Sequence, residues 1–166
     1  MSNLAYARHL IQFYQKNGWP WPTPIKYIGG GANGAVYEGN DGRVIKFTPG
    51  KNSHEVNALR NLQGTHIVPR HGKTKNAALL NLHPTNANLV HKHLFPYLTK
   101  KPTHMMIIVM GKVGGNKGMT LARYLRKYPA ANRSNVQRRV EYLIEQMHLK
   151  GWAHGNLHSE NIIVSV

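Results

Sequence analysis

Apolar residues recur at three- and four-residue intervals in three stretches of the chain, and this spacing predicts amphipathic helices. Two of the stretches begin at capping boxes, Asn52-x-x-Glu55 and Ser134-x-x-Gln137, in which a polar side chain accepts hydrogen bonds from the first turn. A glycine follows each stretch and is expected to end the helix. The three predicted helices cover residues 3–16, 52–63 and 134–150.

Between the first two helices the pattern changes to short apolar runs separated by glycines, which is typical of antiparallel strands. Asn40-Asp41-Gly42 lies between two of these runs and predicts a hairpin turn. A longer apolar run further along the chain predicts a buried strand. The predicted strands cover residues 25–28, 35–38, 43–47 and 104–110. Helices and antiparallel strands in this arrangement indicate an α+β fold.

Prolines at alternate positions in residues 19–24 forbid a regular helix and predict an extended connector. The connector carries Trp19 and Trp21. We expect both tryptophans to pack onto the body of the domain as a clasp, because large aromatic side chains gain most from burial. The alternative is that they anchor a partner protein.

Glycines gather at the turn between the first two predicted strands, in the pattern Gly29-x-Gly31-x-x-Gly34-x-Val36. Because this turn joins two strands, it differs from the dinucleotide-binding fingerprint, in which similar glycines open a helix. The pattern resembles the glycine-rich loop of protein kinases, where missing side chains let backbone amides approach phosphate oxygens.

Two charged residues extend this resemblance. Val44-Ile45-Lys46 resembles the end of the third kinase strand, whose lysine pairs with the phosphates of the nucleotide. Glu55 occupies the position of the glutamate that forms an ion pair with that lysine, although the separation of nine residues requires a tight loop before the helix. Apart from the resemblance, Glu55 is a capping glutamate of the first helical turn.

The C-terminal stretch resembles the kinase catalytic loop, in the pattern His154-x-Asn156-Leu157-x-x-x-Asn161 followed by a short apolar strand. Before it, residues 111–115 resemble the hinge between the kinase lobes, and residues 120–125 resemble the first helix of the second lobe. The motifs occur in kinase order, so the chain resembles the protein-kinase-like superfamily from residue 25 to residue 164.

The resemblance implies a particular domain organisation. Residues 1–24 would form an extra N-terminal helix and the Trp/Pro linker. Residues 25–113 would form a kinase-like N-lobe with a five-stranded antiparallel sheet and one αC-like helix, interrupted by an insertion at about residues 76–103 that fits no family element. Residues 114–166 would form a truncated helical C-lobe that ends after the catalytic-loop-like segment.

Two departures from the family pattern predict that phosphotransfer is lost. Asn156 stands where the family has the aspartate that accepts the proton of the substrate hydroxyl, and an amide cannot act as a general base. The chain also ends before an Asp-Phe-Gly metal-binding segment, so Asn161 is the one metal ligand of the family pattern that it carries. We therefore expect a pseudokinase with no required cofactor and weak ATP binding through Gly29, Gly31, Gly34, Val36, Lys46 and Glu55.

The chain carries 22 lysines and arginines against 6 acidic residues, a formal net charge of +16. No acidic residue occurs between Glu55 and Glu141. Such an excess favours a polyanionic partner, expected here to be nucleic acid bound through its phosphates without sequence readout. The alternative is a charged surface that only aids solubility. The candidate contacts are Lys73, Lys75, Lys100, Lys101, Arg123, Arg126, Lys127, Arg133, Arg138 and Arg139.

The last predicted helix carries an apolar stripe that another element has to cover, because a bare stripe of this size promotes aggregation. We expect the N-terminal helix, the insertion or a second subunit to cover it, and we predict a homodimer. The stripe consists of Val136, Val140, Leu143, Ile144 and Met147.

Composition excludes several kinds of site. There is no cysteine, so disulfides and thiolate metal sites are excluded, and the eleven histidines lack metal-binding spacing. No apolar run is long enough to span a bilayer and no signal peptide is evident, which favours an intracellular protein or one enclosed in the particle of a large DNA virus. The preferred function is an inactive kinase-like scaffold that binds nucleic acid. The alternatives are a nucleotide-binding regulator, half of a phosphotransferase site completed by a partner, and a purely structural oligomer.

Overall fold

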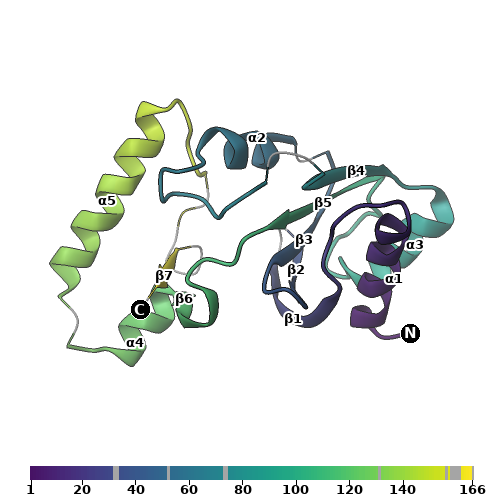
Figure 1. Cartoon of the computed structure of the whole chain (residues 1–166), viewed down its shortest axis with the longest axis horizontal. Coiled ribbons are helices and arrows are strands. Elements are labelled where there is room, and N and C mark those ends of the chain that lie inside the picture. Colours follow the sequence, from purple (N-terminus) through teal and green to yellow (C-terminus); the bar gives the residue numbers. More distant parts are fainter. Residues whose placement is uncertain are drawn as a thin grey trace. The chain divides into compact units, whose positions relative to one another are not determined.

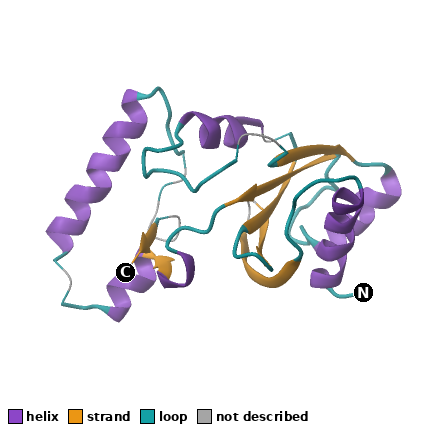
Figure 2. Cartoon of the chain, in the orientation of Figure 1, coloured by secondary structure: helices purple, strands orange, loops and turns teal. Residues whose placement is uncertain are grey.

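Five strands form an antiparallel sheet in the order β1-β2-β3-β5-β4, and helices accompany it in an α+β fold (Figures 1 and 2). Both the predicted fold class and the five-stranded antiparallel sheet are confirmed, and each of the four predicted strands is present. The strands are β1 (Pro24–Gly31), β2 (Gly34–Gly39), β3 (Val44–Pro49), β4 (Ala77–Asn81) and β5 (His104–Met110).

The computed structural model describes residues 1–31, 34–51, 53–72, 75–130, 132–155, 157 and 162–165. The chain divides into two compact units. Unit 1 comprises residues 1–57 and 71–111 and contains the whole five-stranded sheet. Unit 2 comprises residues 58–70 and 112–166.

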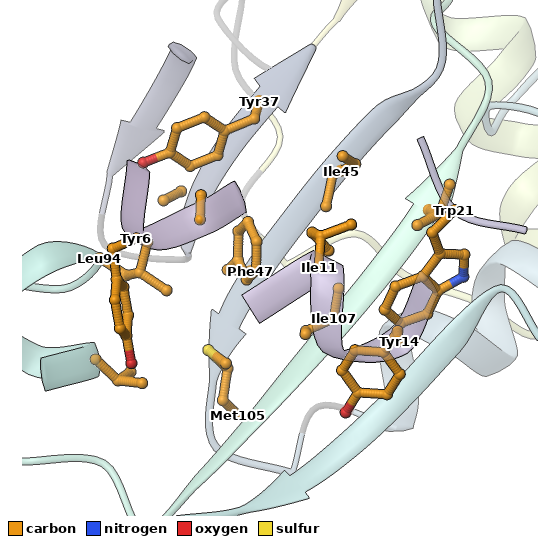
Figure 3. Close-up of a cluster of buried hydrophobic side chains, with 14 of the residues drawn as sticks. Tyr6, Ile11, Tyr14, Trp21, Tyr37, Ile45, Phe47, Leu94, Met105 and Ile107 are labelled. Carbon is orange, nitrogen blue, oxygen red and sulfur yellow. The ribbon is translucent and has the colours of Figure 1, made fainter. Parts of the chain in front are cut away.

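Two helices cover one face of the sheet in unit 1 (Figure 1): α1 (Asn3–Lys16), whose bounds match the prediction, and α3 (Pro84–His93). Side chains alternate between the two faces of a strand, so Ile45 and Phe47 of β3 enter this core while Lys46 faces the opposite side. Figure 3 shows the core, whose larger members include Tyr6, Ile11, Tyr14, Trp21, Tyr37, Ile45, Phe47, Leu94, Met105 and Ile107.

The predicted tryptophan clasp is confirmed. Trp21 is buried, its Nε1 donates a hydrogen bond of 2.6 Å to the Lys75 carbonyl oxygen, and its ring lies 4.6 Å from the ring of Tyr14. Trp19 packs edge-on against Trp21 at 4.8 Å. The connector is thereby attached both to α1 and to a segment more than fifty residues away, which fixes α1 against the sheet.

The prediction that residues 76–103 are entirely an insertion is wrong at its start. Residues 77–81 form β4, which pairs with β5 at the edge of the sheet, and the short helix expected in this region is α3. An edge strand is covered incompletely, and Leu79 remains half-exposed. Residues 77–82 form an apolar run in the sequence, but a run this short does not by itself distinguish a strand from a helical segment, so the pattern did not mark it as a strand.

The glutamate-bearing helix predicted at residues 52–63 is α2 (Ser53–Asn61). Val56 and Leu59 of α2 and Leu62 just after it lie at three-residue spacing and are all buried, as the periodic pattern predicts. Its predicted cap, Asn52, lies outside the described residues.

Unit 2 contains two longer helices, α4 (Leu121–Lys127) and α5 (Arg133–Leu149), the short 3₁₀ helix η1 (Gly115–Lys117), and the paired strands β6 (Gly118–Thr120) and β7 (Ile163–Ser165). The predicted cap of α5 at Ser134 is wrong. The helix begins one residue earlier, and the Oδ1 of Asn132 accepts a hydrogen bond of 3.0 Å from the Asn135 amide. Asparagine and serine cap equally well, so composition alone could not decide between them.

The apolar stripe of α5 is covered only in part in the portion of the chain that the structure describes. Met147 is buried, whereas Val136, Val140, Leu143 and Ile144 are half-buried. The apolar faces of α1 and α3, which were expected to contribute cover, pack in the core of unit 1 instead. The predicted second subunit stays a prediction. None of the described helices is long and apolar enough to cross a membrane.

Candidate nucleotide-binding site

An ion pair stands on the sheet face opposite α1 and α3. Lys46 Nζ lies 2.7 Å from Glu55 Oε1, and both side chains are about three-quarters buried. Lys46 sits in the middle of β3, and Glu55 belongs to the first turn of α2. The loop before α2 is therefore tight enough for the two residues, nine positions apart, to meet. Partial burial shields the pair from solvent and holds the lysine ammonium in one place.

The candidate residues of the sheet form one continuous row. Gly29 of β1 pairs with Val36 of β2, and Val36 pairs with Lys46 of β3. Paired positions in an antiparallel sheet present their side chains on the same face. Gly29 and Val36 are thus placed beside the ion pair, and Gly29, which has no side chain, leaves the backbone beside Val36 uncovered.

The glycine hairpin closes through Gly31, which pairs with Gly34. Gly34 has a φ of +143°, and a Cβ there would overlap the carbonyl oxygen of Phe47 on the neighbouring strand, so only glycine fits. A Cβ on Gly29 would instead meet nothing within 4 Å. Gly34 is required by the fold, whereas Gly29 borders open space that a ligand can enter. The tip, residues 32 and 33, lies outside the described residues.

The six predicted nucleotide-binding residues are therefore brought together: Gly29, Gly31, Gly34 and Val36 on one hairpin, with Lys46 and Glu55 beside it. An ammonium held by Glu55, on the same sheet face as the glycine backbone of β1, is suited to phosphate, which takes charge-assisted hydrogen bonds from both. The residues expected at the vestigial catalytic loop are not all described. His154 is exposed, and Asn156 and Asn161 lie outside the described residues.

The predicted nucleic-acid contacts are exposed wherever they are described. Lys73 lies outside the described residues. Lys75, Lys100 and Lys101 belong to unit 1, and the other six lie on α4 and α5 of unit 2. Within the described residues none of these nine side chains forms an ion pair, in contrast to Arg43, which pairs with Asp41 at 2.7 Å.

One lined cavity was not anticipated from the sequence: it lies on the opposite side of the glycine hairpin, against α1 and the end of α3. Its aromatic walls come from Tyr27 and Tyr37, which pair across the β1–β2 hairpin, and from Tyr97, sixty residues further along, so no local pattern marks all three. As for metal sites, the described part of the chain holds no group of three or more histidine or acidic side chains that could bind an ion.

Comparison of the chain with protein-family models, with curated proteins and with solved structures finds no match.

Proposed function

We propose that this protein is a catalytically inactive, kinase-like nucleotide-binding protein. The observation that carries the proposal is the Lys46–Glu55 ion pair at the end of the row Gly29–Val36–Lys46. The sequence analysis preferred a scaffold that binds nucleic acid and kept a nucleotide-binding regulator as the alternative, and the pairing of these two side chains favours the regulator. The five-stranded antiparallel sheet with its glycine hairpin supports the kinase-like N-lobe that the motifs imply.

The ion pair makes Lys46 a better phosphate ligand than a free lysine would be. A free lysine loses considerable side-chain entropy when it binds, whereas Glu55 already holds this ammonium at 2.7 Å. The ammonium keeps two further donor positions after pairing with Glu55. A β- or γ-phosphate oxygen can therefore bind Lys46 without breaking the ion pair, while amides near Gly29 approach the same phosphates.

Loss of phosphotransfer follows from Asn156, which stands where the family has its catalytic base. Nucleotide binding and phosphoryl transfer have different requirements. Positioning of phosphates needs the lysine and the backbone, whereas transfer also needs a base and two metal ligands. The proposed protein therefore responds to nucleotide by changing stability or partner affinity rather than by turnover.

Lys46→Ala is expected to weaken ATP binding by about 10- to 100-fold, because a hydrogen bond to a charged group contributes about 1.5–3 kcal/mol. Isothermal titration calorimetry on the intact chain measures this directly. Lys51→Ala is the matched control, since it removes the same charge from an exposed position five residues later. Equal weakening in both variants would mean that ATP responds to net charge only, and the proposal would fail.

A second function is supported by a separate observation: nine predicted contact cations are exposed and unpaired in the described structure, six of them on α4 and α5. We propose that these two helices of unit 2 bind nucleic acid through phosphates. Unit 2 has three acidic residues, Glu141, Glu145 and Glu160, to offset its basic ones. The two functions use different units and are testable separately.

A further inference from the structure

A cavity of about 400 Å³ lies behind the glycine hairpin, entirely within unit 1. It is on the side of the sheet that faces α1 and α3, away from Lys46. Its buried floor consists of Gly34, Ala35, Tyr37 and Leu94. No lysine, arginine, aspartate or glutamate is among the described residues that line it. A pocket of this size and lining suits a small uncharged ligand.

The mouth of the cavity is aromatic. Tyr27 and Tyr97 line it and are 55% and 44% exposed, which is unusual for two large rings at one site. Tyr27 packs edge-on against the buried Tyr37 at a centroid distance of 5.4 Å, and Tyr97 packs edge-on against the buried Phe95 at 6.4 Å. Both rings are therefore held in place, with open faces on which a planar molecule can stack.

A buried histidine supplies the polar group. His93 is 8% exposed, stacks on Tyr6 at 4.9 Å, and its Nδ1 lies 3.1 Å from the Oδ1 of Asn3. Because an amide oxygen only accepts, Nδ1 carries the hydrogen and Nε2 of the neutral ring is an acceptor. Burial, followed by the charge of Lys92, lowers the pKa of His93, which keeps the ring neutral at pH 7. Within the described residues Nε2 has no hydrogen-bond partner.

We propose that this cavity binds a neutral aromatic molecule of one or two rings that carries a single N–H or O–H donor. Its ring would stack between Tyr27 and Tyr97, and its donor would bond to Nε2 of His93. A charged ligand is disfavoured because the lining offers no opposite charge to compensate its desolvation. The cavity and Lys46 lie on opposite faces of the sheet, so the ligand would not contact Lys46 or Glu55, although Gly34 of the hairpin borders both sites.

Saturation-transfer NMR on the intact chain, with indole as the probe, tests the site. Indole is expected to bind saturably, and benzofuran, which has the same size but no N–H, to bind about tenfold more weakly. Tyr27→Ala is expected to weaken indole at least about tenfold by removing one wall. Tyr142→Ala removes an equally exposed tyrosine from α5 and should leave binding unchanged.

Tyr27 is exposed, so its replacement is not expected to unfold unit 1, and circular dichroism of the variant checks this. Absence of saturable indole binding, or undiminished binding by a folded Tyr27→Ala variant, would overturn the site. Equal affinities for indole and benzofuran would overturn the assignment of His93 as the acceptor.

Discussion

Replacement of Phe47 by alanine is expected to lower the free energy of unfolding of unit 1 by about 3–5 kcal/mol. The ring of Phe47 is fully buried in the middle of the sheet, packs edge-on against Tyr37 at 5.7 Å, and lies in the core that α1 and α3 share. Truncation there removes buried apolar surface and leaves a cavity that the surrounding strands cannot close. A loss of this size is a large fraction of the stability of an ordinary domain.

Urea denaturation followed by tryptophan fluorescence measures this effect. Trp19 and Trp21 belong to unit 1 and Trp152 to unit 2, so a Trp152→Phe background makes the signal specific for unit 1. Phe13→Ala is the matched control. Its ring, on the outer side of α1, is 65% exposed, so its loss should change the free energy of unfolding by less than about 1 kcal/mol. Similar losses in both variants would contradict the described core.

Neutralising the six candidate cations on α4 and α5 is expected to weaken binding to a random-sequence DNA duplex by about three orders of magnitude or more at 0.1 M salt. Each phosphate contact adds about 0.9 to the slope of log K against log salt, so loss of all six should reduce that slope by about 5. The six are Arg123, Arg126, Lys127, Arg133, Arg138 and Arg139, each changed to glutamine.

The control for this variant has the same net charge. It neutralises six exposed cations that lie outside α4 and α5, so both variants fall from +16 to +10: Lys16, Lys26, Lys51, Arg60, Arg70 and Lys92. Fluorescence anisotropy at a series of salt concentrations gives the slopes. If both variants lose equal affinity and slope, the excess charge acts diffusely and α4 and α5 are not an interface.

The sequence predicted best the elements whose apolar residues all lie in the core. The apolar face of α1 and the uninterrupted run of β5 both lie in the core, and periodicity reports such burial directly. β4 and β6 were missed for a common reason. An edge strand and a three-residue strand are stabilised by pairing with a distant segment, and a local pattern does not contain that partner.

The candidate site, too, was predicted from the sequence only in part. Lys46 and Glu55 were identified because a family motif fixes their order, and the structure adds that they meet at 2.7 Å. Gly29 and Gly34 were predicted to play one role, yet their surroundings differ: one borders open space and the other leaves no room for a Cβ. The tyrosine-lined cavity had no local signature, because the Tyr27–Tyr37 strand pair meets Tyr97 and the ends of α1 and α3 only when these helices pack on the sheet.

Backbone NMR of the ¹⁵N-labelled chain titrated with ATP most directly tests the central claim, that the Lys46–Glu55 pair and the glycine hairpin form a nucleotide site. Saturable chemical-shift changes are expected at the amides of Gly29, Gly31, Lys46 and Glu55. The Lys46→Ala variant should lose these changes, and the Lys51→Ala variant should keep them. Changes confined to α4 and α5 would contradict it, because ATP would then be bound only as one more polyanion by the basic helices.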